Sequence, residues 1–362
     1  MSTLSPCLCP FPPDTVELRG LGFGGNLRGM KAARMHAYGG PDVVHCDHDA
    51  PVPAPGPKEV QIEVHASSVN PIDCKIRAGS LRGALRYDLP RTLGMDVSGV
   101  VSAVGTKVTR FKVGDAVVAS PNPKTPGTWA EFTCVRESEA GRKPANLTHQ
   151  EAAGLPLAFL TAWQALVDTA KLQPGERVLI QAGAGGVGTL AIQVAKHLGA
   201  YVITTCSARN ADLVRSLGAD EVIDYRATPW DEAVKDCDVV LDALGPAEAI
   251  KARKVVRRGG RIVGITTGLP ERVVKSGPIL GLIGTGCFMA KAMAGSRLKS
   301  GIRSRFITRK AIGAQLDVMA ELCESGAIRP VVDSVFGLDD IQVALKLSDS
   351  GRARGKIILG IK

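Results

Sequence analysis

Val178–Gly188, with the sequence VLIQAGAGGVG, decides the fold of this chain. It opens with the apolar and β-branched residues of a short strand, and Gly183, Gly185 and Gly188 then satisfy the pattern G-x-G-x-x-G. Apolar residues at helical spacing follow at once and end at Gly199. A glycine motif between a strand and a helix is typical of a dinucleotide site, because a pyrophosphate can approach the bare backbone and the N-terminus of the helix. A turn with a purely structural role is the alternative.

The second strand of this unit, Tyr201–Cys206, indicates which dinucleotide binds. An NAD site should carry Asp or Glu at the end of this strand, about 20 residues after the glycines, to bind the ribose 2′-hydroxyl. This chain has Ser207 and Arg209 there instead. A hydroxyl and a guanidinium suit a 2′-phosphate, so the sequence favours NADPH over NADH. The alternative is that Arg209 is a solvated surface cation.

Strand-like and helix-like segments continue to alternate after the second strand. This alternation predicts a doubly wound parallel sheet, the Rossmann fold. Ligands of such sheets bind at the carboxyl ends of the strands, which places Ala243–Gly245 and Ile265–Thr267 at the cofactor cleft; ordinary strand–loop junctions are the alternative. The further strands are expected at Glu221–Asp224, Asp238–Leu241 and Arg261–Thr266, and helices at Ala211–Leu217 and Ala247–Val256.

Met30–Pro156 holds short strand-like segments punctuated by glycine and proline, which predicts a compact, barrel-like β domain. Near the end of the chain, Arg329–Val332 and Lys356–Leu359 also have strand-like sequences, and we expect them to return to this domain and make it discontinuous. Residues 1–29 are rich in proline and glycine and are expected to be a disordered extension. The expected domains are therefore the β domain at 30–156 and 326–362 and the nucleotide-binding domain at 157–325.

Asn70, Lys75 and Thr161 are the candidate functional residues outside the glycine motif. Asn70–Asp73 has the pattern of a helix start, with Asn70 as the N-cap and proline next. The functional alternative is that Asn70 and Lys75 project into a substrate cleft as catalytic groups. Thr161, in an apolar helix predicted over Ala152–Val167, is either a cofactor contact or a threonine bonded within its own helix.

The composition limits the partners. The chain has 362 residues, enough for two domains, and a formal net charge of +10 at pH 7. Nine Lys or Arg and no Asp or Glu lie between Arg272 and Leu316. This basic block is either a solvated face or a surface for peripheral contact with a membrane or nucleic acid.

Aromatic residues make up only 4% of the chain, so no nucleic acid is expected. Nine scattered cysteines without C-x-x-C favour a reducing, cytoplasmic location; an organelle is the alternative.

Five motifs spread along Met30–Lys362 carry a resemblance to a known family. They are Ser68–Asp73, Gly94–Gly99, Ala182–Gly188, Leu217–Asp220 with Val222–Tyr225, and Gly351–Lys356. In these the chain looks like a zinc-independent medium-chain dehydrogenase/reductase of the quinone oxidoreductase type. It is similar to the reticulon-interacting mitochondrial oxidoreductases and the chloroplast-envelope quinone oxidoreductase homologues. Zinc-dependent relatives have Cys at the place of Asn70 and His at that of Met95; neither Asn nor Met is a good zinc ligand, so no metal is expected.

The resemblance also implies an architecture, a cofactor and a reaction. It implies a GroES-like β-barrel domain beside the Rossmann domain, a homodimer, and hydride transfer from NADPH to a quinone or an α,β-unsaturated carbonyl. Asn70, Lys75, a ribose hydroxyl or water would bind the substrate oxygen. The alternatives are a zinc alcohol dehydrogenase and an NADPH-binding scaffold or assembly factor with little turnover. The implied cofactor contacts are Gly185, Gly186, Val187, Ser207, Arg209 and Tyr225, with Leu244 and Ile265 on the nicotinamide side.

Overall fold

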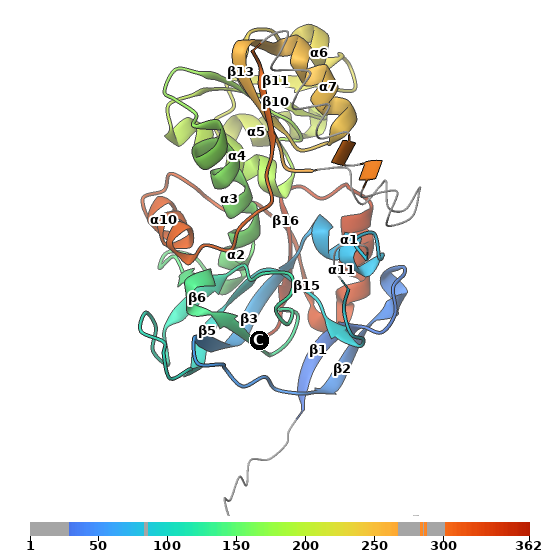
Figure 1. Cartoon of the computed structure of the whole chain (residues 1–362), viewed down its shortest axis with the longest axis vertical. Coiled ribbons are helices and arrows are strands. Elements are labelled where there is room, and N and C mark those ends of the chain that lie inside the picture. The colour runs from blue at the N-terminus through green and yellow to red at the C-terminus, as the bar shows by residue number, and fades with distance from the viewer. Residues whose placement is uncertain (1–28, 83–85, 267–282, 285, 288–300) are drawn as a thin grey trace, which may run out of the picture.

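A computed structural model of the chain describes residues 29–82, 86–266, 283–284, 286–287 and 301–362. Two sheet-containing units stand one above the other in Figure 1, and the chain passes between them more than once. The predicted extension up to residue 28, Thr267 and most of the basic block lie outside the described residues. No helix in the described part of the chain is both long enough and apolar enough to cross a lipid bilayer.

The upper unit contains a six-stranded sheet with the order β11-β10-β9-β12-β13-β14. Every pair of neighbouring strands is parallel. This is the strand order 3-2-1-4-5-6 of dinucleotide-binding folds, and β9 lies at the point where the order reverses. The predicted Rossmann fold is therefore confirmed. The strands are β9 (Arg177–Ile180), β10 (Tyr201–Cys206), β11 (Glu221–Asp224), β12 (Cys237–Asp242), β13 (Val256–Gly264) and β14 (Arg303–Phe306).

Alternate side chains of β9 pack on opposite faces of this sheet. Val178 and Ile180 join the core formed with α3, α4 and α10, whereas Leu179 joins the core formed with α6 and α7. A strand that is buried on both faces reads as a continuous apolar run, as Val178–Ile180 does. The helices are α3 (Pro156–Trp163), α4 (Gly186–His197), α5 (Ala211–Ser216), α6 (Trp230–Ala233), α7 (Pro246–Val255) and α10 (Gly313–Glu324).

The lower unit contains a seven-stranded sheet that combines strands from residues 59–142 with two strands near the C-terminus. Its order is β15-β16-β3-β5-β6-β8, with β7 paired to β3. The last strand, β16, lies antiparallel to β3 with Ile358 opposite Ser68, so this GroES-like domain is discontinuous as predicted. The strands are β3 (Glu59–Val69), β5 (Val97–Val104), β6 (Ala116–Ala119), β7 (Phe132–Arg136), β8 (Ala140–Arg142), β15 (Val332–Gly337) and β16 (Lys356–Gly360).

A small sheet and three helices complete the lower unit. The sheet has the order β2-β1-β4. Helices α1 and α11 contact each other, and α2 lies against β3. The elements are β1 (Met30–Met35), β2 (Val44–Ala50), β4 (Arg91–Thr92), α1 (Pro71–Arg77), α2 (His149–Ala153) and α11 (Ile341–Asp349).

The single helix predicted over Ala152–Val167 is wrong. Helix α2 ends at Ala153 with Gly154 as its C-cap, α3 starts with Pro156 in its first position, and a π-helical segment, Gln164–Ala170, follows α3. Proline has no N–H to continue a helix but fits the first turn of a new one. The apolar composition of the stretch conceals this interruption, because all three pieces are largely buried.

Two strand predictions are displaced along the chain. Strand β13 covers Val256–Gly264 rather than Arg261–Thr266, because its first half carries exposed charged side chains that hide the pattern. Strand β15 covers Val332–Gly337, beginning where the predicted Arg329–Val332 ends. Strands β5, β6, β10 and β11 have the predicted bounds.

Candidate dinucleotide site and the buried network beside it

Close backbone contacts shape the turn between β9 and α4. Ala182 has a φ of 53°, in the left-handed region. A Cβ at Gly183 would lie 2.0 Å from Thr204 Oγ1, and a Cβ at Gly188 would lie 2.3 Å from the carbonyl oxygen of Ala182. Glycine is therefore required at both positions, and α4 packs directly against the end of β9.

The first turn of α4 presents open backbone donors. Val187 and Gly188 donate no backbone hydrogen bond to any residue that the structure describes. The N-cap residue, Gly185, has no side chain that could satisfy them. Unpaired N–H groups at the positive end of a helix dipole suit an anion such as a pyrophosphate. This turn therefore fits the predicted cofactor contact at Gly185–Gly188.

The segment that leads into β16 touches the same turn from the other unit. The Gly355 N–H donates to the carbonyl oxygen of Ala184 at 2.9 Å, and Gly185 and Gly355 form an isolated parallel bridge. A Cβ at Gly186 would lie 2.8 Å from Cδ of Lys356. The two units therefore meet at the glycine turn.

A cavity of about 670 Å³ opens at the carboxyl ends of the strands. Its volume lies within the usual range for cofactor sites. Tyr225 and Leu244 line it and are 52% and 53% exposed, so both present large apolar surfaces to a ligand. Other lining residues include Ala182, Thr205, Arg226 and Trp230.

Ser207 and Arg209 lie beyond the end of β10 and do not line this cavity. Ser207 is buried, whereas Arg209 is exposed and donates from Nη2 to the carbonyl oxygen of Arg352 at 3.1 Å. The sequence reasoning missed Arg226, whose guanidinium lies 5.9 Å from the centroid of the Tyr225 ring and lines the cavity. Its position directly after the Val222–Tyr225 motif was the available signal.

Asp242 is a second residue that the sequence reasoning missed. Its Oδ1 accepts hydrogen bonds from the backbone N–H groups of Leu244 at 3.0 Å and Gly245 at 2.9 Å. Its carbonyl oxygen accepts from the N–H of Ile265 at 3.0 Å. Burial raises the pKa of Asp242 to about 6, although the two N–H groups oppose that shift. Asp242 thus fixes both segments that are predicted to lie on the nicotinamide side, those of Leu244 and Ile265.

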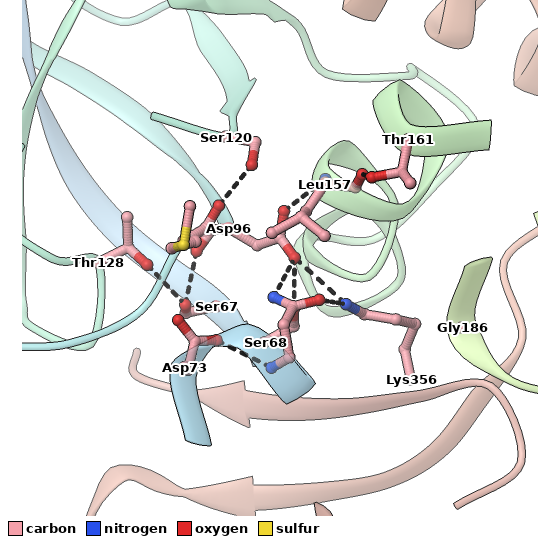
Figure 2. A network of polar contacts seen from close by, with 12 residues as sticks. Ser67, Ser68, Asp73, Asp96, Ser120, Thr128, Leu157, Thr161, Gly186 and Lys356 are labelled. Carbon is pink, nitrogen blue, oxygen red and sulfur yellow. Dashed lines mark hydrogen bonds and ion pairs between the residues drawn. The ribbon is translucent and has the colours of Figure 1, made fainter. Parts of the chain in front are cut away.

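A buried polar network lies where the N-terminus of α3 meets α1 and β16 (Figure 2). Asp96 is at its centre and is fully buried. Its Oδ2 accepts from Ser68 Oγ at 2.6 Å, Asn70 Nδ2 at 2.9 Å and Lys356 Nζ at 3.2 Å. Its Oδ1 accepts from the N–H of Leu157 at 2.7 Å. One carboxylate therefore ties together β3, the N-cap of α1, α3 and β16.

Asn70 belongs to this network and also caps α1. It forms a capping box with Asp73, in which the Asn70 N–H donates to Asp73 Oδ2 at 2.9 Å. The prediction of an N-cap is therefore confirmed. Only 2% of Asn70 is exposed; its Oδ1 accepts from Lys356 Nζ, and its Nδ2 points to Asp96 and Ser68. Burial raises the pKa of Asp73 to about 7, and the Asp96 carboxylate adds to the shift.

Lys75 and Thr161 lie on the helices flanking this network. Lys75 is half-buried in the last turn of α1. Thr161 is 8% exposed, and its Oγ1 donates to the carbonyl oxygen of Leu157 at 2.7 Å. The predicted internal helix bond of Thr161 is thus present, while its contact with a cofactor stays a prediction.

Asn70 and Met95, which the resemblance places where zinc-dependent relatives have Cys and His, are poor zinc ligands. The amide of Asn70 is engaged in the network, and Met95 is buried with its carbonyl oxygen accepting from Ser120 Oγ at 2.6 Å. Neither side chain fits zinc. Within the described ranges, one group brings three His, Cys or acidic ligand atoms within 4.8 Å of one another; it consists of Cys46, His48 and Asp339.

Two family models match parts of the chain. The model described as alcohol dehydrogenase GroES-like domain matches residues 56–145. The model described as zinc-binding dehydrogenase matches residues 217–359. The fold and these matches define an oxidoreductase of the alcohol dehydrogenase type.

Individual relatives narrow this class. The human NAD(P)H oxidoreductase RTN4IP1, mitochondrial, is 38% identical over 84% of this chain and 82% of its own length. The NADPH-dependent alkenal/one oxidoreductase, chloroplastic, of Arabidopsis thaliana is 35% identical over 91% of this chain and 79% of its own length. The quinone oxidoreductase structure from Coxiella burnetii aligns with a TM-score of 0.80 and 32% identity, over 92% of this chain and 99% of that one. The chain belongs to the medium-chain dehydrogenase/reductase family, in its quinone oxidoreductase branch.

Proposed function

We propose that this oxidoreductase transfers hydride from NADPH to a quinone or an α,β-unsaturated carbonyl, without a metal ion. One observation carries the proposal: the N–H groups of Val187 and Gly188 in the first turn of α4 have no backbone acceptor among the described residues, and Ser207 and Arg209 stand beyond β10 where an NAD site has a carboxylate. The names of the relatives, which include a quinone oxidoreductase and an NADPH-dependent alkenal/one oxidoreductase, support the acceptor and the cofactor.

Each part of the site has a proposed task. The bound nicotinamide supplies the hydride, while the protein orients it and excludes water. Negative charge then develops on the substrate oxygen and needs hydrogen-bond donors. Since both N–H bonds of the Asn70 amide point to Asp96 and Ser68, we propose that Asn70 acts by positioning. We propose that Lys75 is the protein group that donates a hydrogen bond to the substrate oxygen. Solvent then supplies the proton that completes the reduction.

The absence of a metal step is part of the proposal. The family model that matches residues 217–359 is described as a zinc-binding dehydrogenase. However, the Asn70 amide is held by Lys356 and Asp96, and Met95 offers only a thioether. Neither supplies the thiolate or imidazole that zinc requires.

The test is an assay of the purified full chain. NADPH and NADH oxidation are measured with 1,4-benzoquinone and with 2-cyclohexen-1-one, each with and without EDTA. We expect turnover that prefers NADPH and survives chelation. Arg209→Gln should raise the KM for NADPH at least tenfold, on the order of 1.4 kcal/mol, and leave that for NADH unchanged. Arg215→Gln, an exposed arginine on the adjacent helix, is the matched control.

Other outcomes would reject the proposal. Equal use of NADH, or loss of activity with EDTA, contradicts the cofactor and the metal-free reaction respectively. Tight NADPH binding without turnover of either acceptor would instead favour a scaffold.

We extend the proposal to organisation and location. The domains are proposed at 30–156 with 326–362 and at 157–325, and the protein is proposed to form a homodimer, which light scattering would test. The mitochondrial and chloroplastic relatives favour an organelle over the cytoplasm. Imaging a fusion with a fluorescent protein at the C-terminus would decide between the two.

A further inference from the structure

A second cavity, of about 400 Å³, lies against the other end of the six-stranded sheet. It shares no lining residue with the cavity at the glycine turn. Its walls are the end of the π-helical segment, the loop before β9, and strands β13 and β14. Strand β14 is the last strand of the sheet and has one neighbour there, β13. The cavity is therefore separate from the site described above.

The lining of this cavity carries an excess of positive charge. Lys171, Arg261, Arg303 and Arg305 line it, against one carboxylate, Glu176. Arg261 is fully engaged, because it donates to Glu176 at 2.8 and 2.5 Å and to the carbonyl oxygen of Ala170 at 2.9 Å. Although burial opposes ionisation of Glu176, these bonds hold its pKa below the ordinary value. The charges of Arg261 and Glu176 therefore cancel. Lys171, Arg303 and Arg305 are the lining cations without a partner among the described residues.

These three cations have no counter-charge among the residues that the structure describes. The side chains of Lys171, Arg303 and Arg305 make no hydrogen bond or ion pair with any residue in the described ranges. The nearby Asp168 accepts from Gln315 at 2.9 Å. The stretch Arg272–Leu316, which contains β14, holds no Asp or Glu.

The strand register brings two of the arginines together. Arg261 and Arg303 are directly paired in the parallel ladder of β13 and β14, and Val263 is paired with Arg305. Paired residues project from the same face, so Arg261, Arg303 and Arg305 share one face. Like charges in such positions destabilise a sheet. An anion in the cavity would remove that repulsion, and planar guanidinium groups suit phosphate oxygens.

We propose that this cavity binds a small soluble anion that carries two or more phosphate groups. Its volume lies in the range of small-molecule sites. Three unpaired cations match a diphosphate group better than a monocarboxylate, because a diphosphate offers several charged oxygens to separate donors. Glu176 remains neutralised by Arg261 and does not repel the ligand.

Inorganic pyrophosphate is the probe that tests the proposal. Its binding to the full chain is measured by titration calorimetry at fixed ionic strength, with saturating NADP⁺ present to fill the cofactor cleft. Arg303→Gln/Arg305→Gln should weaken binding at least tenfold. The control is Arg258→Gln, which removes an exposed arginine from β13 outside the cavity. Arg209→Gln should also leave binding unchanged, and circular dichroism checks that each variant folds.

Several results would overturn the proposal. Undiminished binding by the double variant places the anion elsewhere, and loss of binding in Arg209→Gln places it in the cofactor cleft. If pyrophosphate does not bind, but vesicles with phosphatidylglycerol do so through Arg303 and Arg305, the phosphate source is a lipid headgroup. If pyrophosphate does not bind, and Arg303→Gln/Arg305→Gln changes the oligomeric state, the two arginines form a contact between copies of the chain. If pyrophosphate binds only at ionic strengths far below physiological, the site is an adventitious ion site only.

Discussion

Lys356→Met is the sharpest test of the buried network between the two units. The Lys356 side chain is 6% exposed and that of Asp96 is fully buried, so the pair is shielded from water. Methionine keeps most of the apolar stem but removes the ammonium group. The Asp96 carboxylate then keeps its bonds from Ser68, Asn70 and the Leu157 N–H, while losing the one cation that hydrogen-bonds to it among the described residues.

The size of the effect follows from what remains buried. An uncompensated buried charge costs about 3–5 kcal/mol, a large part of a total stability of about 5–15 kcal/mol. Asn70 Oδ1 also loses its partner, which adds about 1 kcal/mol or more. Lys112→Met is the matched control, since Lys112 forms an ion pair with Asp115 but is 84% exposed; there we expect a loss under about 1 kcal/mol.

The assay is thermal unfolding followed by circular dichroism, with a double-mutant cycle. We expect Lys356→Met to lower the Tm by roughly 5–15 °C and Lys112→Met by less than about 4 °C. The double variant Lys356→Met/Asp96→Asn should lose less free energy of unfolding than the two single variants lose together. The difference should be about 1–3 kcal/mol, because both charges are then gone. Additive losses, or equal effects in Lys356→Met and Lys112→Met, would refute the reasoning.

Three further predictions concern single residues. Burial raises the pKa of Asp73 from 3.8 to about 7; the folded state therefore holds a proton that the unfolded state loses, and stability should fall as pH rises from about 4 to 7. Asp73→Asn should flatten this part of a plot of Tm against pH. Burial lowers the pKa of His149 from 6.5 to about 4, so stability should fall as pH drops through that interval, and His149→Asn should flatten the acid limb. Gly188→Ala drives Cβ into the Ala182 carbonyl and should weaken NADPH binding at least tenfold by fluorescence titration, on the order of 1.4 kcal/mol. Gly337→Ala is the control and should leave NADPH binding unchanged, because a Cβ there would lie 3.7 Å from its nearest neighbour, Asp340 Oδ2.

The parts of the fold that the sequence predicted depend on local signals. The strand, turn and helix at Val178–Gly199 follow one another without interruption, so periodicity and glycine positions suffice to identify them. The same holds for β10 and β11, whose apolar patterns are bounded by polar turns. The interruption at Pro156 was readable in principle, because proline in the first turn marks a helix start. It was missed because the apolar run continues through it.

The buried network was not predictable in this way, because its members are far apart in the chain. Lys356 meets Asn70 across 286 residues and Asp96 across 260. No pattern within one segment indicates which carboxylate faces which ammonium. Asp242 is a milder case: it directly follows the predicted strand Asp238–Leu241, but only the structure shows that the N–H groups of Leu244 and Gly245 both point back to it.

The glycine turn and the buried network are two sides of one structural junction. The backbone of Gly355 bonds to Ala184 in the turn, while the next residue, Lys356, reaches Asn70 and Asp96 in the other unit. Any shift of β16 therefore moves both the N-terminal end of α4 and the cap of α1. The Lys356 side chain packs against the backbone of Gly186, where an added Cβ would lie 2.8 Å from Lys356 Cδ. The positive charge of its ammonium group would therefore attract a phosphate bound at the turn. It follows that loss of the ammonium group should weaken NADPH binding as well as stability, and that both effects should vanish together in a variant that restores a cation at this position, such as Lys356→Arg.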